Sequence, residues 1–138
     1  MRYLQMTKTS GLNHLGLAVK DLEQTTQFFV ELLGWTEAGY DATYPRTGVT
    51  DGKVRLTLWQ IDDTQPTTEF DRKTNVGLHH LALTVTSGTE LTRLHDELNK
   101  APNVDIAFAP ELMGDGPRQH FMCHEPSGIR IEFVWAGI

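Results

Sequence analysis

The chain is poor in cysteine and in basic residues, and both shortages limit what it can be. Its single cysteine, Cys123, cannot form an internal disulfide, so the fold does not depend on disulfide bonds. Twelve basic residues stand against eighteen acidic ones, which gives a formal net charge of −6. An acidic chain without a basic cluster is poorly suited to bind nucleic acid or an anionic membrane. We therefore expect neither kind of partner.

Long hydrophobic runs are also missing. No stretch approaches the roughly 18 apolar residues of a membrane-spanning helix, and the first ten residues, MRYLQMTKTS, lack the apolar core of a signal peptide. With 138 residues, 39% hydrophobic and 22% charged, the composition is that of an ordinary globular domain. We expect a cytoplasmic protein with one domain spanning residues 1–138, in which Cys123 is a buried thiol.

What the chain does contain is an internal repeat. The segment NHLGLAV (13–19) returns as HHLALTV (79–85), and each copy precedes an amphipathic helical pattern. Those helices are predicted to begin after Asp21 and Ser87, because each residue has a glutamine or glutamate three positions later, as in a capping box. Segments typical of strands follow each helix: 35–40, about 43–50 and 54–61 in the first copy, and 104–109, 118–124 and 129–135 in the second.

The repeat predicts an α+β fold built from two β-α-β-β-β modules. The modules span about 10–62 and 77–136, and a polar linker at about 63–76 joins them. Each module is too short to be a comfortable separate domain. We therefore expect the two modules to form a cupped mixed sheet around a central metal or ligand cavity, with the helices on the outside.

Alternation along the strands predicts which side chains face that cavity. In the first strand of each module the large apolar residues take every second position, so His14 and His80 lie on the opposite face among small residues. The same rule applied to IRIEFVW places Glu132 on that face. Each residue alone could be structural, with the histidines bonded to backbone and Glu132 paired with an arginine. Together, two imidazoles and a carboxylate are a ligand set for one divalent ion, Fe(II) or Mn(II) in the first place and zinc, nickel or cobalt otherwise.

The repeat, the two histidines and the closing EPSGIRIEF (125–133) resemble the vicinal oxygen chelate superfamily, which includes glyoxalase I, extradiol dioxygenases, fosfomycin-resistance enzymes and bleomycin-binding proteins. The resemblance covers residues 12–135. It implies a metal ligand at Glu132 and a small-molecule substrate that chelates the metal through adjacent oxygens. Small two-module members of the superfamily are commonly dimers, so the resemblance also implies a homodimer.

Two departures bear on the reaction. Aligning the modules matches Thr57 to Glu132, and glyoxalase I carries a fourth ligand, a glutamate, at the position of Thr57. A hydroxyl replaces that carboxylate poorly, which disfavours a true glyoxalase I. Extradiol dioxygenases carry an acid–base tyrosine ten residues before the last ligand, where this chain has Met122. Isomerisation, lyase chemistry and oxygen-dependent cleavage all stay open.

Other residues are candidates for substrate contact. His120 is expected to act as acid, base or substrate contact if the EPSG hairpin has the register that turns it toward Glu132. Arg55 and Trp59 share the face of Thr57, and with Met122 these residues are expected to bind substrate. The alternative to a metal-dependent enzyme is a metal-free small-molecule-binding protein of the bleomycin-resistance type, which would use the same cup to sequester a ligand.

Overall fold

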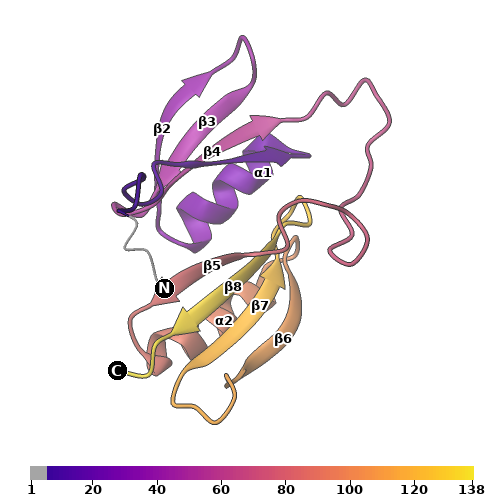
Figure 1. Cartoon of the computed structure of the whole chain (residues 1–138). Coiled ribbons are helices and arrows are strands. Elements are labelled where there is room, and N and C mark those ends of the chain that lie inside the picture. Colours follow the sequence, from indigo (N-terminus) through magenta and orange to yellow (C-terminus); the bar gives the residue numbers. More distant parts are fainter. Residues whose placement is uncertain (1–5) are drawn as a thin grey trace.

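The computed structural model describes residues 6–138, and the first five residues of the N-terminal segment considered above lie outside that range. The chain forms two modules with nearly the same element order (Figure 1). The first module contains β1 (Leu15–Val19), α1 (Leu22–Gln27), the π-helical turn η1 (Phe28–Leu32), β2 (Thr36–Asp41), β3 (Arg46–Thr50) and β4 (Arg55–Gln60). The second contains β5 (Leu81–Val85), α2 (Gly88–Lys100), β6 (Asp105–Leu112), β7 (Gln119–His124) and β8 (Arg130–Trp135). The predicted α+β fold is confirmed.

Each module forms its own four-stranded mixed sheet. The strand orders are β1-β4-β3-β2 and β5-β8-β7-β6, with the first pair of each sheet parallel and the others antiparallel. Gly16 lies opposite Thr57 in the first sheet, as Ala82 lies opposite Glu132 in the second. The structure therefore places Thr57 and Glu132 at equivalent positions of the two modules.

The two helices begin as their capping residues predict. The Asp21 side chain accepts a hydrogen bond from the backbone N–H of Gln24 at 3.0 Å, and the Ser87 hydroxyl accepts one from that of Glu90 at 3.1 Å. Helix α2 ends at Lys100, two residues before Pro102. These side chains satisfy backbone donors that the first helical turn leaves without a partner.

The first helix differs from the single amphipathic helix that its pattern predicts. After Gln27 it widens into η1, and Phe28 and Phe29 are both buried, with ring centroids 5.2 Å apart in an edge-to-face arrangement. A wider turn changes the angular spacing of neighbouring residues, which allows two consecutive phenyl rings to reach the core. The segment ends at Gly34, whose φ of 73° suits glycine.

The hydrophobic core is continuous between the modules. Leu17, Leu56 and Phe29 from the first module belong to the same buried cluster as Leu91 and Phe133 from the second. Cys123 is also in this cluster, and burial raises the pKa of its thiol to about 12, which confirms the predicted buried cysteine. Residues of both modules thus contribute to one buried cluster.

No strand of one sheet pairs with a strand of the other within residues 6–138. Strands β1 and β5 are edge strands, so the predicted cup is divided between two sheets. Polar contacts also join the modules: the Thr25 hydroxyl donates to Glu125 at 2.7 Å, and the backbone N–H of Lys20 donates to the Ser127 hydroxyl at 2.9 Å. Within the same residues, no helix has both the length and the apolar character needed to cross a bilayer.

Candidate metal and substrate site

The candidate residues lie on the faces of the two sheets that point away from the core. Leu17, Leu56 and Leu58 turn toward the helix of the first module and are buried. Their neighbours Gly16 and Thr57 therefore take the other face, since successive side chains of a strand alternate. We call these surfaces the open faces of the first and second sheets.

Glu132 is the centre of the open face of the second sheet. Although it is a carboxylate, only 7% of it is exposed. One oxygen lies 2.7 Å from His120 Nδ1 and the other lies 3.7 Å from His80 Nε2. Met122 is directly opposite Glu132 across the β7–β8 ladder. The structure thus brings together four of the residues that the sequence singles out.

His120 faces Glu132 because the β7–β8 ladder is regular. Residues pair without a register shift from Gln119 opposite Trp135 to His124 opposite Arg130. Directly opposed residues share a face, so His120, Met122 and His124 all take the side of Glu132. The geometric condition placed on His120 is met, whereas a catalytic role for it stays a prediction.

The spacing of His80 and Glu132 fits two ligands of one ion. Their 3.7 Å separation is too long for a hydrogen bond. Two ligands that are each about 2.1 Å from an ion are about 3 to 4 Å apart. His120 holds the other carboxylate oxygen by a hydrogen bond, as outer partners of metal-binding carboxylates commonly do.

His14 does not join this cluster within one chain. It precedes β1 at the edge of the first sheet, is exposed, and its Nδ1 lies 2.7 Å from the side-chain oxygen of neighbouring Asn13. Across residues 6–138, no three histidine, cysteine, aspartate or glutamate side chains converge in a group that could hold a metal ion. The ligand set predicted from sequence is therefore not assembled by a single copy.

The open face of the first sheet is aromatic and basic. The Trp59 indole N–H donates to the Thr57 hydroxyl at 3.0 Å, Tyr44 packs edge-on against its ring, and the Arg46 guanidinium lies 5.4 Å from the ring centroid. Arg55 extends across Gly48, where a Cβ atom would come within 2.7 Å of the guanidinium. Aromatic faces and guanidinium groups are suited to bind flat or anionic molecules.

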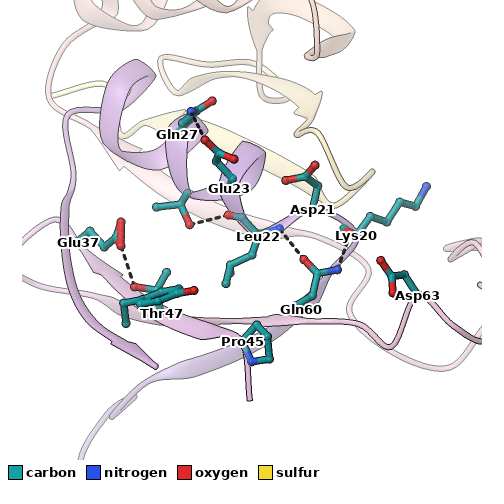
Figure 2. A pocket seen from close by; sticks show the side chains of 12 residues that line it. Lys20, Asp21, Leu22, Glu23, Gln27, Glu37, Pro45, Thr47, Gln60 and Asp63 are labelled. Carbon is teal, nitrogen blue, oxygen red and sulfur yellow. Dashed lines mark hydrogen bonds between the residues drawn. The ribbon is translucent and has the colours of Figure 1, made fainter. Parts of the chain in front are cut away.

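A pocket of about 640 Å³ lies at the start of α1, on the helix side of the first sheet (Figure 2). Several of its polar groups form hydrogen bonds within the protein. The Gln60 side chain accepts from the backbone N–H of Leu22 at 2.8 Å and donates to the carbonyl of Lys20 at 2.6 Å. The Thr47 hydroxyl donates to Glu37 at 3.2 Å (Figure 2). We assign this pocket no function.

Sequence reasoning missed the buried Glu125 in the EPSG turn. Its carboxylate is 2% exposed and accepts hydrogen bonds from the Thr25 hydroxyl and from the backbone N–H groups of Ser127 and Ile129. Burial raises the pKa of this carboxyl, and the hydrogen bonds offset the rise only in part. The turn sequence itself indicates that Glu125 can accept from the backbone N–H groups of its own hairpin. The contact with Thr25 could not be predicted, because Thr25 lies 100 residues away in the sequence.

Comparison with known proteins agrees with this fold. A family model described as the Glyoxalase/Bleomycin resistance protein/Dioxygenase superfamily matches residues 11–133. A glyoxylase/bleomycin resistance protein/dioxygenase domain from Frankia sp. EAN1pec is 26% identical, covers 94% of this chain and 99% of its own, and superposes with a TM-score of 0.79.

Two further solved structures are similar. A putative glyoxalase from Bacillus halodurans is 26% identical over 90% of this chain and 94% of its own, with a TM-score of 0.75. The fosfomycin resistance protein FosX from Listeria monocytogenes shares the fold at 20% identity, over 92% of this chain and 93% of its own, with a TM-score of 0.70. A search of curated protein sequences found no match.

Proposed function

Because the chain belongs to the Glyoxalase/Bleomycin resistance protein/Dioxygenase superfamily, we propose that it is a metal-dependent enzyme acting on a small molecule with adjacent oxygens. The observation that carries this proposal is the cluster around Glu132. The Glu132 carboxylate is only 7% exposed and has one oxygen against His120, while its other oxygen and His80 Nε2, 3.7 Å apart, are placed to bind one cation between them. His80 and Glu132 would supply two of the ligands.

The third ligand in this proposal is His14 of a second copy of the chain. Within one copy His14 does not join His80 and Glu132, yet its strand β1 and the strand β5 that follows His80 are both unpaired edges. Edge strands expose backbone donors and acceptors that a second copy can pair. In a two-fold homodimer, β1 of each copy would lie beside β5 of the other, which brings the two open faces together into one cup.

The residues around the cup would then have distinct roles. His120 holds the Glu132 carboxylate in position and is the nearest side chain able to exchange a proton beside it, whereas Met122 has none to exchange. Arg55, Thr57 and Trp59 would face these groups from the other copy and bind the substrate. The nitrogen and oxygen ligands suit Fe(II) or Mn(II). When bound, such an ion would polarise the substrate oxygens.

This arrangement favours acid–base chemistry, an isomerisation or lyase reaction, over oxygen-dependent ring cleavage. His120 is in contact with the proposed ligand Glu132, and Met122 occupies the position where a tyrosine would serve a catechol dioxygenase. The proposed ligands include a single carboxylate, Glu132, and Thr57 adds no second one. A divalent ion with these ligands would keep a net positive charge, which would favour an anionic, chelating substrate.

Replacing Glu132 with glutamine tests the metal site. We expect Glu132→Gln to weaken Mn(II) binding by about tenfold or more, because a charged ligand is lost, and to leave the circular dichroism spectrum unchanged. Glu111→Gln is the matched control: its carboxylate lies 3.6 Å from His120 but is largely exposed. If the metal content of Glu132→Gln equals that of the unaltered protein, the proposed site is wrong. An unaltered protein that binds neither Mn(II) nor Fe(II) would instead support the metal-free binding function.

A further inference from the structure

A second cavity lies beside the candidate metal site. Its volume is about 660 Å³, within the usual range for small-molecule sites. Residues of the linker between β4 and β5, namely 67–72 and 76–79, form one wall, and the linker is seen at one side of the molecule in Figure 1. The beginning of β8 and the edge of β1 complete the cavity.

Positive and donor groups gather in this cavity. Arg72 and His79 from the linker line it together with His124 and Arg130 from the second sheet. His124 and Arg130 lie directly opposite each other across the β7–β8 ladder, so their side chains take the same face of the second sheet. The two arginines and the two histidines thus belong to the wall of a single cavity.

The two arginines of the cavity lack acidic partners. Arg72 and Arg130 form no ion pair within residues 6–138, although the charge of Glu132 reaches Arg130 from two residues along β8. Two buried nitrogen atoms, Arg130 Nε and His124 Nδ1, find no hydrogen-bond partner there, although an exposed Asp105 carboxylate lies 3.6 Å from the second. A buried guanidinium N–H such as that of Arg130 is costly unless a ligand or a water molecule accepts from it.

The acidic residues of the cavity are already engaged. Glu69 pairs with Lys20, and the Asp71 carboxylate accepts from the backbone N–H of Lys73 at 2.8 Å. Apolar side chains form the remaining surface, among them Phe70, Leu78 and Ile129. A cavity with a basic end and an apolar wall is complementary to an organic molecule that carries one oxyanion.

We propose that this cavity binds a small organic oxyanion, a carboxylate or a phosphonate with an apolar body, through Arg72 and Arg130. The four polar groups come from the linker and the second sheet. The proposal uses no metal ion, and its success or failure is therefore separate from that of the metal site.

Calorimetric titration of chelator-treated protein with phenylphosphonate and with benzoate tests it. We expect saturable binding of at least one probe at millimolar concentration or below, weakened about tenfold in Arg72→Gln because one charged hydrogen bond is lost. Lys73→Gln is the matched control, since it removes the same charge from the next residue, which does not line the cavity. Arg130→Gln should weaken binding to a similar degree.

Each outcome decides the matter. Tighter binding of phenylphosphonate indicates a phosphate-type ligand, and tighter binding of benzoate indicates a carboxylate. Either result supports the proposal if Arg72→Gln loses affinity and Lys73→Gln does not. Absence of binding by both probes, or equal loss in Lys73→Gln and Arg72→Gln, overturns it. Because Arg72 is exposed on the linker, its replacement leaves the core intact.

Discussion

Two buried glutamates of the second module have different environments. Glu125 accepts two backbone N–H groups and the Thr25 hydroxyl, so its oxygens are occupied by the fold itself. Glu132 touches imidazoles on an open face, and no backbone donor contacts its side chain within residues 6–138. The first carboxylate therefore stabilises the junction of the modules, whereas the second is available to a ligand.

The buried Glu125 makes stability depend on pH. Its folded-state pKa is raised above the ordinary value of 4.5, so the folded chain holds more protons than the unfolded chain between these two pKa values. The free energy of unfolding therefore falls as pH rises through that window. Glutamine cannot titrate and keeps an oxygen for the two backbone donors, so Glu125→Gln should flatten this fall.

Urea unfolding at several pH values between about 4 and 8 measures the effect. Glu125→Gln should match the unaltered protein at the acidic end and exceed it at the basic end. Glu125→Ala is the control for lost contacts: it should be about 1 to 3 kcal/mol less stable than Glu125→Gln at every pH, because the buried donors lose their acceptor. Parallel pH profiles for the glutamine variant and the unaltered protein would show that Glu125 is not the titrating group.

At the scale of single elements, capping residues determine where the helices begin. Ser87→Ala should lower the free energy of unfolding by about 1 kcal/mol, because the hydroxyl that accepts from the N–H of Glu90 is lost. Thr92→Ala, on the exposed side of the same helix, should be neutral or slightly stabilising. Thermal or urea unfolding of both variants checks this, and an equal loss in both would contradict the capping role.

Elements and strand faces could be predicted from the sequence because they depend on local periodicity. Alignment of the two repeat copies placed Thr57 and Glu132 at equivalent positions, and the structure has the same register in both modules. The π-helical turn at Phe28 and Phe29 could not be predicted, since the wider turn is stabilised by tertiary packing that no local pattern encodes.

The arrangement of the two modules relative to each other could not be predicted from the sequence either. The repeat predicted that His14, His80 and Glu132 each lie on the side of their sheet away from the large apolar residues. It could not predict that one copy of the chain forms two separate sheets. The linker cavity was missed for a similar reason. Arg72 lies in a polar segment without periodicity, and only the folded chain brings it beside Arg130.

At the scale of the whole molecule, the proposed metal site has to be shared between two copies of the chain. The open face of the second sheet carries His80 and Glu132, the first sheet carries His14 at its edge, and within residues 6–138 no single-chain cluster unites them. A homodimer that pairs β1 with β5 would produce two identical cups, each built from both copies. Two variants that each destroy the site should therefore complement one another in a mixed dimer.

The direct measurement is the metal content of mixed dimers of His14→Ala and Glu132→Gln, isolated through a different affinity tag on each chain. In a shared-site dimer both substitutions fall in one cup and the other cup keeps His14, His80 and Glu132 intact. We expect each variant alone to bind almost no Mn(II), and mixed dimers to bind about half as much as dimers of the unaltered chain. Mixed dimers that bind no more metal than the separate variants would contradict it.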